Sequence, residues 1–199
     1  MRRYSVLGNC QSEPIARLLS SCCEFSEEYE YVSIKPVHTI DLDKDAHLLE
    51  KIADLDLLIY QPVLDERRFG PFVSSNIVSQ LADGSVKICV PPLYYGGYFP
   101  TFEAINWLDG PLRGVHDYLI LACFLNNLSV NDALGFLSSG KISEEIILSQ
   151  HKGFIHGLKQ RELKFGVDVR VADFIEERFR ETRLFYTFNH PAPEMLRRV

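Results

Sequence analysis

The sequence predicts an α/β fold in which helices flank a core of parallel strands. Three observations support this prediction. Short apolar runs, typical of buried strands, alternate with helical segments in the first half of the chain. The chain has 199 residues, enough to bury a large core. Hydrophobic residues make up 46% and charged residues 24%, which is typical of a globular protein and excludes a disordered chain, a coiled coil or a collagen-like repeat.

The first half of the chain alternates between strands and helices. Strands are expected near residues 4–8, 55–60 and 86–90, and residues 29–37 also alternate like a strand. Helices are expected between them, where apolar residues recur at helical spacing, at about 11–23, 43–53 and 72–81. This βαβα order predicts parallel strands, because each helix carries the chain across one face of the sheet to the next strand.

The second half is mainly helical. Helices are expected at about 116–128, 130–137 and 143–163. A β-like stretch at 167–171, a helix at about 172–180 and a strand at 184–187 follow. We expect this last strand to join the parallel sheet. The pattern predicts a single α/β domain over 1–199, with a helical insertion at about 112–165 that forms a cradle or cap.

The charge balance argues against several classes of partner. The 21 Lys and Arg residues are outnumbered by 27 Asp and Glu residues, so the net charge is −6. A general nucleic-acid binder would be basic instead. No apolar run approaches the ~18 residues of a membrane span, and the first run is too short for a signal peptide. We therefore expect a cytoplasmic protein with no nucleic-acid partner and no membrane span.

The cysteines fit the same compartment. The chain has an odd number of them, five, and two are adjacent. Their spacing does not match a zinc site, so no metal is expected. Free thiols in a reducing compartment explain this pattern best. The five residues are Cys10, Cys22, Cys23, Cys89 and Cys123.

Polar residues follow three of the expected strands, and these positions form the candidate site. In open α/β sheets, ligands bind outside the carboxyl ends of the strands. The three segments are Gly8-Asn9-Cys10-Gln11, Gln61-Pro62 and Asn189-His190-Pro191. Gly8 has no Cβ, so it allows a tight turn or the close approach of a ligand.

Cys10 and His190 are the candidate catalytic pair. Cys10 is expected at the start of the first helix, where the helix dipole favours the thiolate. A histidine titrates near neutral pH, so His190 can accept a proton from the thiol. The structural alternatives are an inert buried thiol at Cys10 and a surface turn residue at His190.

Three amide side chains lie in the segments of the candidate site. Two of them flank Cys10, and the third follows the strand expected at 55–60. Asn9, Gln11 and Gln61 can donate hydrogen bonds to a developing oxyanion, together with backbone N–H groups at the first helix. Each amide, taken alone, is better explained as a turn-capping residue. Their convergence on the ends of the expected strands favours the oxyanion hypothesis.

An aromatic loop and one histidine complete the candidate ligand-binding residues. Tyr95 and Tyr98 lie in the loop at 93–100, where they either wall a pocket or pack the loop onto the sheet. His116 either begins a helix, which is the preferred interpretation, or contributes to the site. His151 and His156 are expected to face solvent on a helix.

Five segments together resemble a known family. They are VLGNCQ at 6–11, IYQPV at 59–63, VPPLYYGGYFP at 90–100, VHD at 115–117 and RLFYTFNHP at 183–191. In this order they resemble the WcbI-like polysaccharide-biosynthesis proteins. The resemblance implies a deep cradle for coenzyme A and O-acetyl transfer from acetyl-coenzyme A to a sugar or glycan acceptor. It also implies a role in capsule or surface-glycan assembly, with a possible partner protein of that machinery.

The first motif is also similar to the nucleophile block of GDSL/SGNH-type hydrolases, with Cys10 where their serine stands. Those enzymes usually have an acid three residues before the late histidine, whereas this chain has Thr187 there. The orienting acid is therefore open among Asp168, Asp173 and Glu162. Two other functions stay open: a coenzyme A or nucleotide-sugar binding module that needs a partner, and a thiol esterase.

An acidic protein must concentrate cations where it binds an anionic molecule such as coenzyme A. The sequence has neither a GxGxxG motif nor a P-loop, so side chains and helix ends must hold the phosphates. Arg67 and Arg68 are the preferred candidates, because they follow an expected strand end closely. Lys159 and Arg161 on the long helix are the others. The alternative for the two adjacent arginines is a solvated loop.

Overall fold

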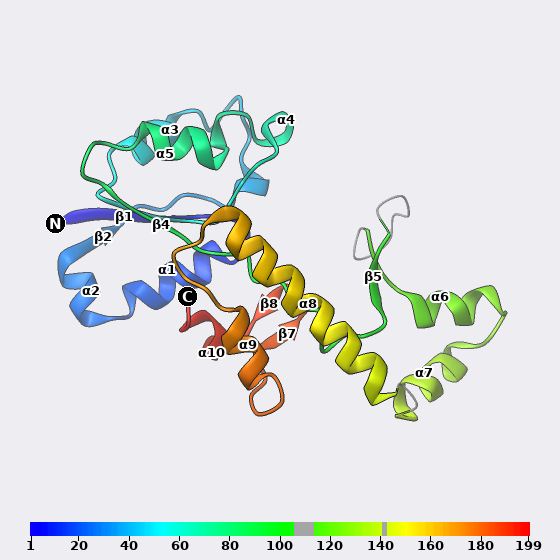
Figure 1. Cartoon of the computed structure of the whole chain (residues 1–199). Helices are drawn as coiled ribbons and strands as arrows, with labels where there is room; N and C mark the ends of the chain where they lie inside the picture. Colours follow the sequence, from blue (N-terminus) through cyan, green and yellow to red (C-terminus); the bar gives the residue numbers. More distant parts are fainter. Residues whose placement is uncertain (106–113, 141–142) are drawn as a thin grey trace. The chain divides into compact units, whose positions relative to one another are not determined.

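A parallel sheet organises the first of two units into which the chain divides. The computed structural model describes residues 1–105, 114–140 and 143–199 (Figure 1). The first unit comprises Met1–Tyr94 and Leu158–Val199, and the second comprises Tyr95–Gly157.

The sheet of the first unit has four strands in the order β2-β1-β3-β4, and all neighbours are parallel. The strands are β1 (Arg2–Leu7), β2 (Tyr29–Tyr31), β3 (Leu57–Tyr60) and β4 (Val86–Cys89). Leu7 lies opposite Tyr60, and Tyr60 lies opposite Cys89. The residues after β1, β3 and β4 therefore emerge at one edge of the sheet. The predicted α/β fold with a parallel core is confirmed.

Helices cover both faces of this sheet. Figure 1 shows α3 and α5 on one face and α1 and α2 on the other. The helices of this unit are α1 (Ser12–Ser20), α2 (Cys23–Glu28), α3 (His47–Ala53), α4 (Glu66–Phe69), α5 (Ser74–Gln80), α9 (Ala172–Arg178) and α10 (Pro193–Leu196), with short 3-10 turns η1 (Val37–Thr39) and η2 (Gly70–Phe72).

The side chains of each strand pack alternately on the two faces of the sheet, because successive residues of a strand point to opposite faces. Tyr4 and Val6 pack in the cluster that includes Ile15 and Ala16 of α1. Leu7 belongs to the other cluster, which contains residues of α3 and α5. Leu58 packs on the same side as Leu7, whereas its neighbours in β3 pack on the side of α1. Both faces are apolar, as a buried parallel sheet requires.

Three expectations for this unit need correction. The strand expected at 184–187 does not join the parallel sheet: β7 (Phe185–Thr187) pairs antiparallel with β8 (His190–Pro191) in a separate ribbon. Only two residues separate these strands, a length that fits a hairpin, whereas a parallel neighbour needs a long crossover. Residues 167–171 form no strand. The strand expected at 29–37 ends at Tyr31, and the 3-10 turn η1 follows Pro36.

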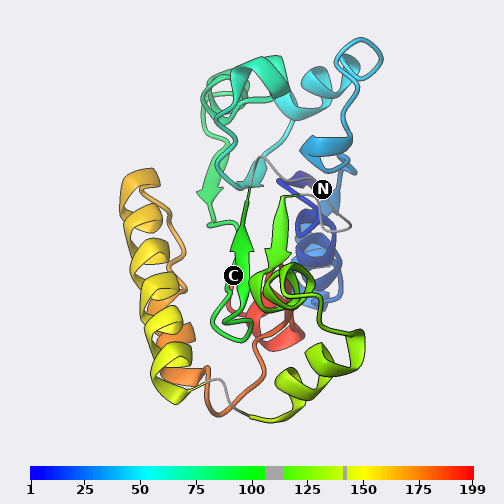
Figure 2. The same cartoon turned by 90° about the vertical axis from the view of Figure 1, so that its right-hand side faces the viewer.

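The second unit contains an antiparallel pair and helices (Figure 2). Strand β5 (Phe102–Ala104) pairs with β6 (Val115–Asp117), and α6 (Tyr118–Leu125) and α7 (Val130–Ser138) follow. Helix α8 (Glu144–Phe165) begins in this unit, and from Leu158 onward its residues belong to the first unit.

The expected helix at 116–128 begins two residues late. Asp117 is the N-cap of α6, since its carboxylate accepts hydrogen bonds from the backbone N–H groups of Leu119 (2.9 Å) and Ile120 (3.2 Å). His116 therefore lies in β6 and does not begin the helix. In the described ranges 1–105, 114–140 and 143–199, no helix has the length and apolar character needed to cross a membrane.

Candidate functional site

The turn between β1 and α1, residues 8–11, carries Cys10; we call it the GNCQ turn. Asn9 shapes it, because its Oδ1 accepts a hydrogen bond from the backbone N–H of Gln11 at 2.8 Å. The carbonyl of Asn9 accepts from both the backbone N–H and the hydroxyl of Ser12. Gln11 is the N-cap residue of α1, so Cys10 lies just before the helix, with its side chain exposed.

Gln61, the first residue after β3, holds the GNCQ turn from the neighbouring strand. Its Oε1 accepts a hydrogen bond from the backbone N–H of Asn9 at 3.0 Å, and its Nε2 donates to Oε1 of Gln11 at 3.0 Å. Gly8 is required beside it, because a Cβ at this position would lie 2.5 Å from Oε1 of Gln61. Gln61 is only 2% exposed.

Gln11 connects the turn to two distant segments. Its Oε1 accepts from the backbone N–H of Leu93 at 2.9 Å, and its Nε2 donates to the carbonyl oxygens of Leu93 (2.7 Å) and Asn189 (2.9 Å). Both amide hydrogens of Gln11 are thus engaged. We call Asn9, Gln11 and Gln61 the amide cluster. Their bonds join the three predicted segments and, in addition, the loop at Leu93.

The histidine of the late motif is oriented by Thr187. The Thr187 hydroxyl donates its hydrogen to Oδ1 of Asn189 at 2.9 Å. Its hydrogen bond with Nδ1 of His190 therefore requires the hydrogen on Nδ1, which leaves the lone pair on Nε2. The sequence shows at Thr187 only the absence of an acid, because the side-chain partner of a histidine cannot be found from spacing alone. His190 and Cys10 are both exposed, and their pairing stays a prediction.

Arg161, on the part of α8 that belongs to the first unit, is linked to the amide cluster through Tyr94. The hydroxyl of Tyr94 accepts a hydrogen bond from Nδ2 of Asn9 at 3.2 Å, and the charge of Arg161 interacts with Tyr94. Burial lowers the pKa of Arg161, against the opposing effects of Glu162 and Tyr94. Its Nη2 is buried and has no hydrogen-bond partner in the described part of the chain. A buried guanidinium nitrogen without an acceptor is rare, and an anionic ligand would satisfy it.

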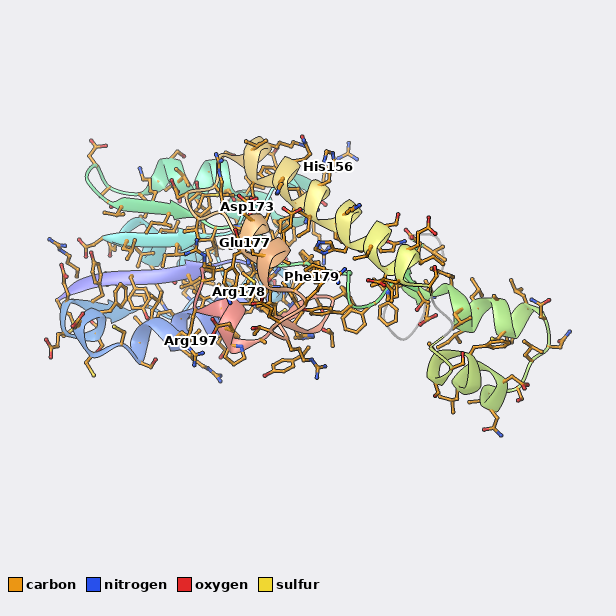
Figure 3. The ribbon with its side chains drawn as sticks, turned by 60° about the horizontal axis from the view of Figure 1, so that its bottom comes forward. His156, Asp173, Glu177, Arg178, Phe179 and Arg197 are labelled. Atoms are coloured by element: carbon orange, nitrogen blue, oxygen red, sulfur yellow. The ribbon has the colours of Figure 1, made fainter. Side chains whose placement is uncertain are left out.

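Lys159, the other candidate cation on α8, is already paired. Its Nζ lies 2.8 Å from Oδ1 of Asp173 and 2.6 Å from Oε2 of Glu176. The hydrogen bond to Asp173, followed by that to Glu176, raises the pKa of Lys159. Figure 3 shows Asp173 on α9 together with Glu177 and Arg178.

The other two candidate acids also have structural partners. Oε1 of the buried Glu162 accepts hydrogen bonds from the backbone N–H groups of Val171 (2.7 Å) and Ala172 (3.0 Å), at the start of α9. Oδ2 of Asp168 accepts from the backbone N–H of Cys89 at 2.7 Å. Both carboxylates thus tie backbone segments together.

Arg67 and Arg68 lie in α4, and both are exposed. The guanidinium of Arg68 lies over the ring of Phe69, 5.1 Å from its centroid. Arg67 forms no ion pair within residues 1–105, 114–140 and 143–199. A role for either residue in binding coenzyme A stays a prediction.

Tyr95 and Tyr98 belong to the second unit. Tyr95 is buried, and its hydroxyl forms a hydrogen bond with Nδ1 of His151 at 2.7 Å. Burial raises the pKa of Tyr95. The ring of Tyr98 packs edge-on against that of Tyr95. The expectation that His151 faces solvent is wrong, since it is only 5% exposed and pairs with this buried hydroxyl. His156 is exposed, as expected.

His116 lines a cavity of ≈560 Å³ in the second unit, together with mostly apolar residues such as Phe102 and Phe124. Among the described residues of this lining there is no lysine or arginine. In the parts of the chain that the structure describes, no group of three or more His, Cys, Asp or Glu side chains could hold a metal ion.

The chain is similar to proteins of one known family. The model of the family described as "Polysaccharide biosynthesis enzyme WcbI" matches residues 3–199. A solved structure of WcbI, described as a native protein without a disulfide bond between coenzyme A and one of its cysteines, is 30% identical and has a TM-score of 0.87. The match covers 98% of this chain and 66% of that one. No significant match was found among curated proteins.

Proposed function

Since this chain belongs to the WcbI family of polysaccharide biosynthesis enzymes, we propose that it transfers an acetyl group from acetyl-coenzyme A to a hydroxyl of a glycan. The observation that carries this proposal is the GNCQ turn. It presents the exposed thiol of Cys10 on the amide cluster, in which Gln11 and Gln61 are buried, and Gln11 also binds the loop that carries His190.

The residues around the turn fit coenzyme A. This molecule is anionic, and Arg161 has a buried nitrogen that finds no acceptor among the residues that the structure describes. Arg161 would hold a phosphate or carbonyl oxygen, and Arg67 and Arg68 are the exposed cations for the remaining phosphates. When bound, acetyl-coenzyme A supplies the acetyl group as a thioester, whose sulfur is a good leaving group. The relative's description, which mentions coenzyme A together with a cysteine, supports the same site.

His190 is the proposed base of the reaction. With the hydrogen on Nδ1 facing Thr187, Nε2 can take the proton from an attacking group and return it to the departing thiolate. The attacking group is either the glycan hydroxyl or the thiol of Cys10. In the second case the acetyl group passes to the Cys10 sulfur and then to the glycan oxygen, so that one thioester is broken and one ester is formed overall.

The backbone N–H of Cys10 is the proposed oxyanion donor. Within the described residues it makes no hydrogen bond, whereas the N–H groups of Gln11 and Ser12 are occupied by Asn9. It lies just before α1, where backbone N–H groups favour negative charge. We propose that Gln11 positions the turn and does not itself donate to the oxyanion, because both hydrogens of its amide are engaged.

Mass spectrometry of the intact protein after incubation with acetyl-coenzyme A tests the covalent route. An acyl-enzyme adds about 42 Da to the wild type, and Cys10→Ala, which leaves no nucleophile at this position, should abolish this adduct. Cys22→Ala is the matched control, because Cys22 is another exposed thiol. An adduct that survives in Cys10→Ala would exclude Cys10 as the acetylated residue. Acetyl transfer to glycan without any adduct would favour direct attack by the hydroxyl.

Calorimetric titration with coenzyme A tests binding separately. Arg161→Met should weaken binding about tenfold, from the loss of one charged hydrogen bond. Arg170→Met is the control, since Arg170 is an exposed arginine of the same unit. If the wild type does not bind coenzyme A, the proposed function is wrong. If it binds coenzyme A but transfers no acetyl group in any assay, the chain is a binding module instead.

A further inference from the structure

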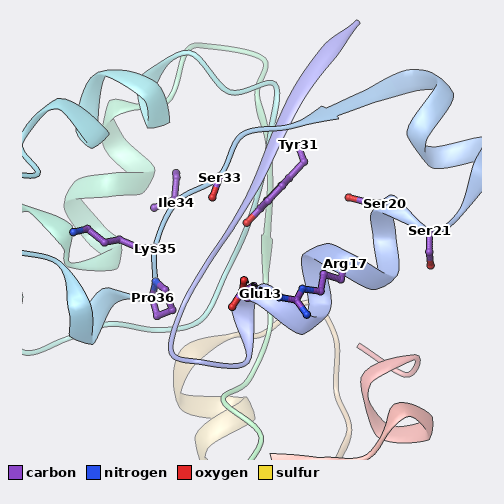
Figure 4. Close-up of a pocket in the computed structure, with 9 residues that line it drawn as sticks. All are labelled: Glu13, Arg17, Ser20, Ser21, Tyr31, Ser33, Ile34, Lys35 and Pro36. Atoms are coloured by element: carbon purple, nitrogen blue, oxygen red, sulfur yellow. Dashed lines mark hydrogen bonds and ion pairs between the residues drawn. The ribbon is translucent and has the colours of Figure 1, made fainter.

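A groove with a mixed polar and apolar lining lies beside the GNCQ turn, between α1 and the segment that follows β2 (Figure 4). Its volume is ≈460 Å³, within the range of roughly 300–1,000 Å³ that small-molecule sites occupy. The segment is fixed next to the turn, because the backbone N–H of Val37 donates to the carbonyl of Gly8 at 2.9 Å. Glu13, in the first turn of α1, lines the groove three residues after Cys10.

Hydroxyl groups from both sides line this groove. Ser20 comes from the end of α1, and its Oγ lies 2.7 Å from the hydroxyl of Tyr4. Tyr31 and Ser33 come from the opposite side, where Figure 4 shows the phenol of Tyr31 pointing toward Glu13. Burial raises the pKa of Tyr31, so its hydroxyl is protonated and can donate at neutral pH. The groove thus offers donors and acceptors within a short distance of each other.

The charges in the groove are balanced. The guanidinium of Arg17 lies 3.0 Å from Oε1 of Glu13, and Lys35 is paired with the carboxylate of Asp45. A phosphate would have to compete with both carboxylates for these cations. The hydroxyls of a neutral ligand can instead accept from Arg17 and Lys35 while they donate to Glu13, without breaking either pair. The apolar atoms of Ile34 and Pro36 also line the groove and can contact the C–H groups of a ligand ring.

We propose that this groove binds a neutral sugar ring of the glycan. Three features support a sugar over other ligands: several hydroxyl groups, a carboxylate and a guanidinium that form a neutral pair, and apolar surface along the groove. That the bound ring belongs to the acceptor of the transfer reaction rests on the proposed function. Binding of the sugar itself depends only on the groove.

Nuclear magnetic resonance of the whole ¹⁵N-labelled chain tests this inference. The probes are the methyl glycosides of glucose, galactose and mannose, and inorganic phosphate is titrated separately. We expect at least one glycoside to shift the amide signals of residues 13–21 and 31–36 in a saturable manner. Arg17→Ala should weaken this binding about tenfold, because it removes a charged donor. Glu13→Gln, which keeps the side-chain size, should weaken it as well.

Arg178→Ala is the matched control, because Arg178, the last residue of α9 (Figure 3), forms a similarly exposed ion pair with Glu181, and neither residue is among the described residues that line the groove. It should leave the glycoside affinity unchanged. The inference is overturned if no glycoside shifts these signals, or if phosphate saturates them and the glycosides do not. Acetyl transfer without any shift in the groove would refute the sugar site alone. Glycoside binding without acetyl transfer would refute the proposed function alone.

Discussion

Replacement of Gln11 by alanine should destabilise the first unit strongly, because Gln11 joins three segments that are distant in sequence. The substitution removes four hydrogen bonds: one donated to and one accepted from the backbone of Leu93, one donated to the carbonyl of Asn189, and one accepted from the amide of Gln61. Leu93 is 0% exposed and Gln61 is 2% exposed, so water cannot easily replace the lost partners.

The expected loss follows from the groups left without a partner. These are the N–H and the carbonyl of Leu93 and one amide hydrogen of Gln61, whereas the carbonyl of the half-buried Asn189 can be hydrated. An unsatisfied buried polar group costs about 1–3 kcal/mol. Three such groups at the lower end of this range give a loss of about 3 kcal/mol. That is a large fraction of the roughly 5–15 kcal/mol that stabilises a domain.

Urea denaturation followed by circular dichroism measures this loss. Gln80→Ala is the matched control, because Gln80 is an exposed glutamine at the end of α5 and should change the free energy of unfolding by less than about 0.5 kcal/mol. A loss below about 1 kcal/mol in Gln11→Ala would refute the reasoning. It would mean that the amide cluster does not hold the GNCQ turn against the loops at Leu93 and Asn189.

Three further predictions concern the same unit. Gly8→Ala should cost about 1–3 kcal/mol in urea denaturation, because its Cβ would overlap the buried glutamine after β3; an unchanged midpoint would contradict this. Lys35 holds the pKa of Asp45 below its usual value, so this ion pair stabilises the folded protein at neutral pH, and the contribution is lost as the pH falls below about 4. Lys35→Met should therefore reduce the change in the free energy of unfolding between about pH 6 and pH 3 in urea denaturation. Glu162→Ala should cost about 2 kcal/mol or more, because two buried amides lose their acceptor, while the exposed Glu177→Ala should change little in the same assay.

The sequence by itself determined the class of fold and the position of the GNCQ turn. The apolar runs before Gly8, Gln61 and Pro91 are short and continuous, and only strands buried on both faces account for them between helices. Parallel order then brings their carboxyl ends to one edge. The meeting of residues 8–11 with residue 61 was therefore predictable from local periodicity, and the hydrogen bonds of Gln61 to Asn9 and Gln11 agree with it. Asn189 reaches Gln11 from a separate antiparallel ribbon, so its position did not follow from parallel order.

Only the tertiary structure decided which hydrogen-bond partner each polar side chain has. The partners of Gln11 at Leu93 and Asn189 lie 82 and 178 residues away in sequence, so no local pattern reveals that its amide is already engaged. The same holds for the burial of His151 against Tyr95, and for the buried nitrogen of Arg161, which has no partner in the described part of the chain. Periodicity reports which face of an element is buried. The hydrogen-bond partner of a polar group depends on which distant segments meet around it, and only packing in three dimensions sets that.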